Sequence, residues 1–188
     1  MQNTYVFLRH AKITKNTAEP SDKWVLSDEG IKYVEEVAAT GIFDDVNVII
    51  TSSQKKVIQT AYFLAERLGK DIITNPSLNE IDKGSVLIED PIEYENQVVK
   101  VLEKPDESIS EWETANQALK RFQLGMNRIE QEHSHKKILI VTHGIVLTLY
   151  FASILKESTE DTISRWKKLK SCAWGIVKDK KVVHDIVE

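Results

Sequence analysis

The sequence has very little cysteine: Cys172 is the single one among 188 residues. One cysteine cannot form a disulfide within the chain, which excludes the class of disulfide-stabilised secreted domains and favours a reducing compartment. The N-terminal stretch MQNTYVFLRH also lacks the basic and apolar regions of a secretory signal peptide. We therefore expect a cytoplasmic protein.

An excess of basic residues is also missing. The chain has 25 Lys and Arg against 29 Asp and Glu, which gives a formal net charge of -4. Nucleic acids and anionic membranes bind strongly basic surfaces, so we expect neither as a partner. An anionic ligand would have to be bound by a local cluster of cations. The composition gives no indication of the oligomeric state.

Glycine and proline are scarce, with 7 and 4 residues, and no Gly/Ser-rich linker or internal repeat divides the chain. A hydrophobic content of 41% over 188 residues is sufficient to bury one sizeable core. We expect a single domain over residues 1–188.

The sequence motifs of common cofactor sites are absent. There is no GxxxxGK[ST] loop and no GxGxxG loop, so nothing indicates a nucleotide site. His133 and His135 lie in the polar turn HSHKK, without an HExxH pattern or a cysteine partner for a metal. Cys172 has no local motif that activates a thiolate. We expect neither a metal nor an organic cofactor.

A run of eighteen residues without a charged side chain, ILIVTHGIVLTLYFASIL over 138–155, reaches the length of a transmembrane helix. Its character changes in the middle, because residues 138–141 are strand-like and Thr142-His143-Gly144 interrupts the run. A strand covered on both faces of a sheet is continuously apolar. We interpret the run as a buried strand followed by a buried helix, and not as a membrane span.

Strand-like and helix-like segments alternate along the chain. Ser27 can cap a helix that Gly41 ends, and Gly69 ends the next one. This alternation is typical of an α/β fold, a three-layer sandwich with a mostly parallel central sheet. The expected strands are residues 5–8, 47–51, 71–74, 138–142, 173–177 and 182–187, and the expected helices are 27–40, 53–68, 111–132 and 145–155.

The segment 85–110 fits the alternation poorly. It is acidic, contains Pro91 and Pro105, and has one short helical stretch around 92–102. We interpret it as a short inserted cap segment that lies over the site; a plain surface excursion is the alternative.

Three of the expected strands run directly into residues that can bind an anion. In an open parallel sheet, ligands bind beyond the carboxyl ends of the strands, where free N–H groups and helix dipoles also favour anions. The three strand ends bring cations, histidines and hydroxyl groups to the same edge. The residues are Arg9 and His10 after the first strand, Ser52, Ser53, Lys55 and Lys56 after the second, and Thr142, His143 and Gly144 after the long apolar one.

Such a set of side chains suits a phosphate-sized dianion. With nucleotide, metal and thiolate motifs absent, the remaining chemistry is a histidine nucleophile. A neutral imidazole nitrogen attacks phosphorus, and the covalent phosphohistidine is then hydrolysed. Each feature alone has an ordinary structural interpretation, such as a histidine that caps a strand or lysines on a solvated helix face.

Five blocks of the sequence resemble, in order, the motifs of the histidine phosphatase, or phosphoglycerate mutase-like, superfamily. LRHA with Asn16 resembles LRHGxTxxN, and TSSQKKVIQTA resembles SSPxxRAxxTA. LNEIDKG is similar to LxEIDxG, WETANQALKR to GESxxxxxxR, and VTHG to the motif of the second histidine. The blocks span most of the chain.

The resemblance implies a role for several residues. His10 would be the nucleophile, with His143 beside it and Glu80 as the proton donor that later activates water. Arg9 and Lys56 would bind phosphoryl oxygens, and a nucleophilic His10 must be neutral, so neighbouring cations should lower its pKa from about 6.5. Further contacts to the substrate are expected from Asn16, Ser52, Lys55 and Gly144.

Two positions depart from the family pattern. Ala11 replaces the glycine after the nucleophile, a small change that the backbone can accommodate. Lys56 stands where the family has a second arginine, and lysine keeps the charge but loses the planar pair of donors. The loss of one charged hydrogen bond costs about 1–3 kcal/mol, and Lys55 could replace part of the contact.

The sequence therefore predicts a metal-independent phosphomonoester hydrolase that acts on a small phosphorylated substrate. A phosphomutase of the phosphoglycerate type is the alternative among enzymes, although the stretch between Glu80 and Glu111 is short for the insertions that such mutases carry. A non-catalytic protein that binds phosphorylated ligands is the alternative from another class, suggested by Ala11 and Lys56. The sequence does not indicate which phosphate ester is the substrate.

Overall fold

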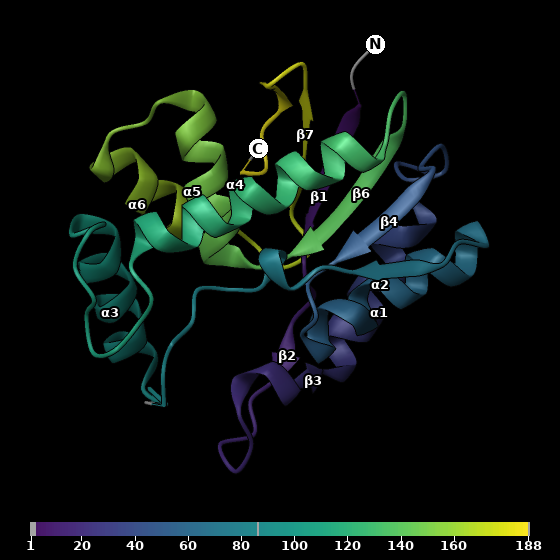
Figure 1. Ribbon diagram of the computed structural model, residues 1–188. Helices are drawn as coiled ribbons and strands as arrows, with labels where there is room; N and C mark the ends of the chain where they lie inside the picture. Colours follow the sequence, from purple (N-terminus) through teal and green to yellow (C-terminus); the bar gives the residue numbers. More distant parts are fainter. Residues whose placement is uncertain (1–2, 86, 188) are drawn as a thin grey trace.

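The computed structural model describes residues 3–85 and 87–187, and its centre is a six-stranded sheet in the order β5-β4-β6-β1-β7-β8 (Figure 1). The first four strands of this order are parallel, β7 is antiparallel to β1, and β8 is antiparallel to β7. The sheet is therefore mostly parallel, as predicted. Its strands are β1 (Thr4–Arg9), β4 (Val48–Thr51), β5 (Ile72–Thr74), β6 (Lys137–Thr142), β7 (Trp174–Lys178) and β8 (Lys181–His184).

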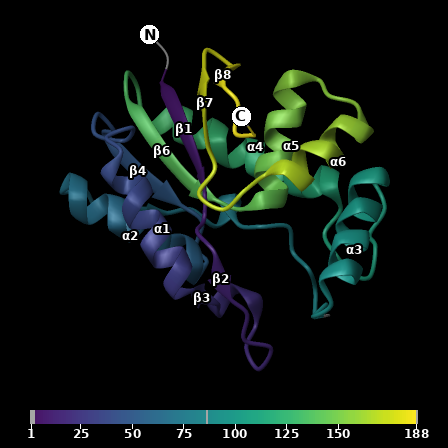
Figure 2. The same cartoon turned by 180° about the vertical axis from the view of Figure 1, so that it is seen from behind.

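Helices cover both faces of the sheet, so the predicted three-layer α/β architecture is confirmed (Figures 1 and 2). Alternate side chains of β1 enter two different cores: Tyr5 and Phe7 pack on the side of α4 and α5, and Val6 and Leu8 pack on the side of α1 and α2. Burial on both faces is why this strand is continuously apolar. The helices are α1 (Asp28–Ala39), α2 (Lys55–Leu68), α3 (Pro91–Glu103), α4 (Ala115–Glu132), α5 (Gly144–Leu155) and α6 (Thr159–Lys168).

Helix ends follow local sequence signals. The Ser27 side chain accepts a hydrogen bond from the N–H of Gly30 and caps α1, and Gly69, with a φ of 60°, ends α2 in a left-handed conformation. The helix expected from Glu111 begins instead at Ala115. The reason is a capping box in which Thr114 and Gln117 exchange side-chain and backbone hydrogen bonds.

Two features were not expected from the sequence. Strands β2 (Ile13–Thr14) and β3 (Val25–Leu26) form a separate two-stranded ribbon after β1.

The second feature is helix α6, which follows α5 and is fixed by ion pairs of Arg165 with Glu157 and Asp185. The Arg165 side chain is almost completely buried, and its two carboxylate partners come from a loop and from the segment after β8. An arginine in this position needs both partners, because an unpaired buried charge is strongly destabilising.

The long apolar run divides as predicted, into the strand β6 and the helix α5. Strand β6 is buried almost throughout, and α5 is buried over its first half and along one side of its second half. Among residues 3–85 and 87–187, no helix has both the length and the apolar character needed to cross a membrane.

The segment 85–110 contains α3, which packs against α6. Buried side chains of α3, including Val98 and Val101, join the core on the α4–α5 side of the sheet. Ile88 and Tyr94 pack against the edge of this core and also line the cavity described below. The segment therefore forms a side wall of that cavity; whether it acts as a cap stays a prediction, and Val86 lies outside the described residues.

Candidate active site

The carboxyl ends of three adjacent strands, β4, β6 and β1, open into one cavity of about 1440 Å³. Parallel register places Arg9 opposite Thr142, and the N–H of His10 donates to the Thr142 carbonyl over 2.9 Å. The N–H of Ser52 donates in the same way to Val141 over 3.1 Å. This register brings the residues after the three strands to one point. The β2–β3 ribbon and α3 lie beyond the carboxyl ends of these strands (Figure 1).

The predicted site residues fall into three groups. Five line the cavity together: Arg9, His10, Lys56, Glu80 and His143. Ser52 and Gly144 do not line it but lie next to residues that do, Ser52 against His143 and Gly144 against Arg9. Asn16 and Lys55 are not among the residues that line the cavity.

His10 is set up to present one neutral nitrogen. Its Nδ1 lies 2.8 Å from the carbonyl oxygen of Ala11, and because a carbonyl only accepts, Nδ1 carries the proton. The Nε2 atom therefore keeps its lone pair. Burial, together with the charge of Arg9, lowers the pKa of His10 to about 3. The ring is therefore neutral throughout the physiological pH range.

His143 lies beside His10, with ring centroids 5.3 Å apart and the rings nearly perpendicular. Its Nε2 is 2.7 Å from the Ser52 hydroxyl, which also accepts a hydrogen bond from the N–H of Gln54. Burial is the main cause that holds the pKa of His143 well below 6.5, and His10 adds to it. Its Nδ1 is buried and has no hydrogen-bond partner among the described residues.

Arg9 is buried next to the start of α5. Its Nη1 donates to the Leu169 carbonyl, while its Nε is buried and without a partner in the described part of the chain. A Cβ atom on Gly144 would lie 3.2 Å from that Nε, so the glycine leaves the space that the guanidinium occupies. Burial lowers the pKa of Arg9, yet a guanidinium stays charged in proteins. Arg9 Nε and His143 Nδ1 are thus two buried polar atoms without a partner among the described residues.

Lys56 is buried in the first turn of α2. Its Nζ donates to the Ser21 carbonyl over 2.7 Å and lies 5.8 Å from the centre of the Trp24 ring, so it connects α2 to the segment between β2 and β3. Burial, with the charge of Lys83, lowers the pKa of Lys56 to about 8. The ammonium is the dominant form at neutral pH but not far above it.

The structure does not bring Asn16 and Lys55 to the cavity, for local reasons. The Asn16 side-chain oxygen accepts the N–H of Ala18 over 3.1 Å, and its carbonyl accepts from the Trp24 indole, so the residue is engaged in its own turn. Lys55 lies on the exposed side of α2, one residue before the buried Lys56. Neighbours on a helix point about 100° apart, so Lys55 faces solvent where Lys56 faces the cavity.

Glu80 occupies the N-terminus of α5. Its two carboxylate oxygens accept hydrogen bonds from the N–H groups of Ile145 and Val146, each over 3.1 Å. A helix N-terminus favours a carboxylate through its free N–H groups and its dipole. The start of α5 therefore lies between Arg9 and Glu80 and contacts both side chains.

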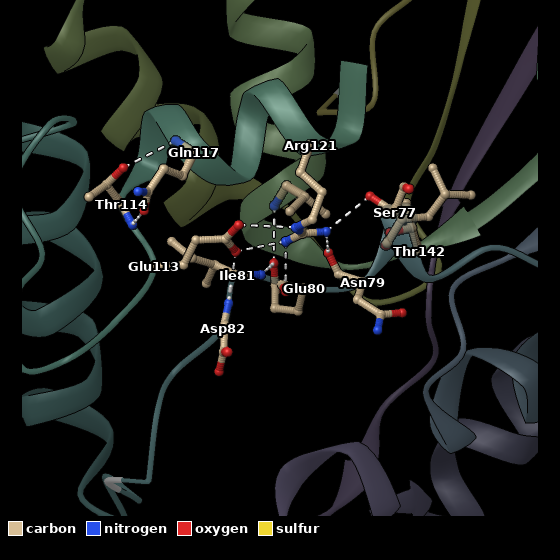
Figure 3. A network of polar contacts seen from close by, with 12 residues as sticks. Ser77, Asn79, Glu80, Ile81, Asp82, Glu113, Thr114, Gln117, Arg121 and Thr142 are labelled. Carbon is tan, nitrogen blue, oxygen red and sulfur yellow. Dashed lines mark hydrogen bonds and ion pairs between the residues drawn. The ribbon is translucent and has the colours of Figure 1, made fainter. Parts of the chain in front are cut away.

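The loop that carries Glu80 is held by Arg121 of α4 (Figure 3). The guanidinium donates to the carbonyls of Ser77, Asn79 and Glu80 and forms an ion pair with Glu113 over 2.8 Å. Glu113 in turn accepts the N–H of Asp82 over 3.1 Å, and the Thr142 hydroxyl donates to the carbonyl of Leu78. The family-like blocks LNEIDKG, WETANQALKR and VTHG thus meet in one network that fixes the position of the Glu80 backbone.

Several cavity residues were not singled out from the sequence. Lys83 and Arg121 belong to motif blocks already quoted, so their place in those blocks was an available signal. Tyr94 of the expected cap had no such signal.

Cys172, whose N–H lies 3.5 Å from the His10 carbonyl, is buried. Burial raises the pKa of its thiol to about 12, so it is not a thiolate.

A sequence profile of the histidine phosphatase superfamily (branch 1) matches residues 5–181. The chain belongs to this superfamily. The probable phosphoglycerate mutase GpmB of Proteus mirabilis (strain HI4320) is 29% identical over 136 residues, which cover 69% of this chain and 63% of that protein. The corresponding protein of Cronobacter sakazakii (strain ATCC BAA-894) is 26% identical over 137 residues, again 63% of its length. The chain thus spans less than two thirds of these relatives.

Solved structures show the same fold. Bacillus stearothermophilus YhfR superposes with a TM-score of 0.77 at 17% identity, over 99% of this chain and 100% of that one. A mycobacterial glucosyl-3-phosphoglycerate phosphatase gives 0.74 at 17% identity, over 92% and 88% of the two chains. A phosphoserine phosphatase mutant from Entamoeba histolytica gives 0.71 at 18%, over 97% and 94%.

The departure from the histidine phosphatase pattern at Ala11 is accommodated without strain. Ala11 is completely buried, and its N–H donates to the Thr60 hydroxyl over 3.0 Å. Thr60 in turn donates to the carbonyl of Lys56 over 2.8 Å. The segment after His10 is therefore tied to the first turns of α2, the helix that carries Lys56.

Proposed function

We propose that the protein is a metal-independent phosphomonoester hydrolase that acts through a covalent phosphohistidine on His10. The observation that carries this proposal is the state of His10 itself. A neutral ring with its proton on Nδ1 and a lone pair on Nε2 lines a cavity together with Arg9, Lys56 and His143. A neutral imidazole nitrogen surrounded by cations and polar hydrogens is what attack on a phosphate dianion requires.

In the first step, the lone pair of His10 Nε2 forms a bond to phosphorus, and the bond from phosphorus to the ester oxygen breaks. The departing alkoxide takes a proton from Glu80, which must enter this step as the carboxylic acid. Arg9, Lys56 and His143 stabilise the charge that spreads over the three peripheral oxygens in a loose transition state. In the second step, Glu80 takes a proton from water, the water oxygen attacks phosphorus, and the N–P bond breaks to release inorganic phosphate and neutral His10.

A phosphomutase is the second candidate, because the curated relatives are named probable phosphoglycerate mutases. The first step would be the same, but a hydroxyl group of the substrate would replace water in the second. Release of inorganic phosphate supports the hydrolase, and conversion of one phosphate isomer into another without release supports the mutase. A protein that binds phosphate esters but converts none would be the non-catalytic alternative. The cytoplasmic location and the lack of nucleic-acid and membrane partners stay predictions.

Hydrolysis of a phosphate ester in EDTA tests the proposal. We expect the protein to release inorganic phosphate from p-nitrophenyl phosphate at the same rate with and without the chelator, because the cations of the site are side chains. Vanadate should inhibit competitively, since it mimics the five-coordinate transition state. A rate that disappears in EDTA and returns with a divalent metal would favour a metal-assisted mechanism. A broader panel of esters would then narrow the substrate.

Lys56 predicts an alkaline limit to the activity. With its pKa lowered to about 8, the side chain is charged below that pH and neutral above it, so phosphate binding weakens as the pH rises. We expect kcat/KM to decline above about pH 8, approaching a tenfold loss per pH unit. Lys56→Arg keeps the charge, so its kcat/KM should stay level between pH 8 and pH 10. The same decline in both proteins would exclude Lys56 as the titrating group.

A further inference from the structure

A second group of hydrogen-bond donors lines the cavity, apart from Arg9 and the two histidines. Lys83 lies in the loop after Glu80, Tyr94 lies on α3, and Trp112 precedes α4. The Lys83 Nζ donates to the Tyr94 hydroxyl over 2.8 Å. It also lies 4.7 Å from the centre of the Tyr94 ring and 5.5 Å from that of Trp112. Three segments of the chain thus hold one ammonium group in place.

The charge of Lys83 is uncompensated. The side chain is half-buried, yet it forms no ion pair with any carboxylate in the described residues. Ring faces stabilise an ammonium by about 0.5–2 kcal/mol but do not neutralise its charge. The Tyr94 oxygen accepts from Lys83, so its own proton is available to another acceptor. The Trp112 Nε1 is a third donor, buried and without a partner among these residues.

Lys83 and Tyr94 line the same cavity as Arg9 and His10. Burial and Arg9 are the main causes of the lowered pKa of His10, and the charge of Lys83 contributes to it. Burial is the main cause of the lowered pKa of Arg9, and Tyr94 is close enough to Arg9 to contribute to that pKa. Across the cavity, the exposed Lys15 reaches within 5.9 Å of the Tyr94 ring centre, which adds a second cation beside the same ring.

We propose that Lys83 and Tyr94 form a subsite for a second anionic group of the substrate, carried by the leaving group and separated from the reacting phosphate by a short linker. Adjacent donors from an ammonium and a hydroxyl match two oxygens of one carboxylate or one phosphate. Lys83 is then a specificity-determining residue. This inference rests on the proposed function, because it assumes that the reacting phosphate is bound at His10.

Equilibrium binding to the His10→Ala protein tests the subsite without turnover. The ligands are 2-(phosphooxy)acetate and 3-(phosphooxy)propanoate, each compared by calorimetry with ethyl or propyl phosphate, and ethane-1,2-diol bisphosphate serves as the ligand with a second phosphate. We expect the carboxylates or the bisphosphate to bind about 10- to 100-fold more tightly than the matched alkyl phosphate, which lacks the second anionic group. Lys83→Met should remove this difference, and Tyr94→Phe should reduce it. Preference for the carboxylates or for the bisphosphate identifies the group recognised.

Lys100→Met is the matched control, because Lys100 is an exposed lysine of α3 that does not line the cavity. It removes the same charge and should leave the binding difference unchanged. Equal binding of the ligands with and without the second anionic group, or equal losses in the Lys83 and Lys100 variants, would overturn the subsite. Turnover of p-nitrophenyl phosphate by the chain with His10 tests the proposed function separately. If the chain with His10 turns over p-nitrophenyl phosphate but the His10→Ala protein does not prefer ligands with a second anionic group, the subsite alone is refuted. If that preference is found but the chain with His10 is inactive, the hydrolase proposal alone is refuted.

Discussion

His10→Ala should lose turnover by a factor of at least about 10⁴, because it removes the atom that forms the bond to phosphorus. The fold should remain, since the His10 side chain lines the cavity and belongs to neither of the two apolar cores. Initial rates with p-nitrophenyl phosphate measure the first effect. The far-ultraviolet circular dichroism spectrum and the midpoint of thermal unfolding measure the second.

His135→Asn is the control for this variant. His135 is exposed, lies outside the cavity and has a φ of 57°, a left-handed conformation that asparagine adopts more readily than most residues. Its rate should equal that of the unchanged protein. If His10→Ala folded normally and kept most of its turnover, the covalent mechanism would be wrong, and metal-assisted attack by water would have to be tested instead.

Glu80→Gln should slow esters of poor leaving groups far more than aryl esters. An alkyl alkoxide needs a proton as it departs, and the loss of a general acid costs about 10²- to 10⁴-fold. A p-nitrophenolate leaves without one, so its rate of phosphoryl transfer should fall by less than about tenfold. The measurement is kcat/KM for ethyl phosphate and for p-nitrophenyl phosphate, in the variant and in the unchanged protein.

Asp82→Asn controls for the Glu80 experiment, because Asp82 is another carboxylate that lines the cavity, two residues away. It should affect both esters equally and weakly. Equal losses for the two esters in Glu80→Gln would mean that Glu80 only holds the start of α5, to which both of its oxygens are bonded. A leaving-group effect that appeared in Asp82→Asn instead would make Asp82 the proton donor.

Much of the fold could be predicted from the chain because its signals are local. The apolar runs around Phe7 and Ile140 are strands buried on both faces, and Ser27 and Gly69 mark helix ends by their own hydrogen bonds and φ angle. The convergence of Arg9, His10 and His143 was also predictable, because the carboxyl ends of parallel strands meet at one edge.

The remaining features depend on contacts that local sequence does not encode. Helix α6 has a polar sequence, and its position depends on Arg165 meeting Glu157 and Asp185, which are 8 and 20 residues away along the chain. Tyr94 becomes a cavity residue only because α3 packs beside the loop that holds Lys83. Asn16 matches the family pattern, but the turn that follows it engages its side-chain oxygen with Ala18. The sequence motifs identify such residues, but their positions depend on how the elements pack in the folded chain.

Trapping the phosphoenzyme tests the central claim most directly. The protein is mixed with substrate for a few milliseconds, denatured without acid, digested and analysed by mass spectrometry, because a phosphohistidine is lost in acid. We predict one added phosphoryl group on the peptide that contains His10, absent from His10→Ala and from samples held in acid. A protein that turns over substrate but carries no phosphoryl group at any early time, or carries it on a residue other than His10, would contradict the account.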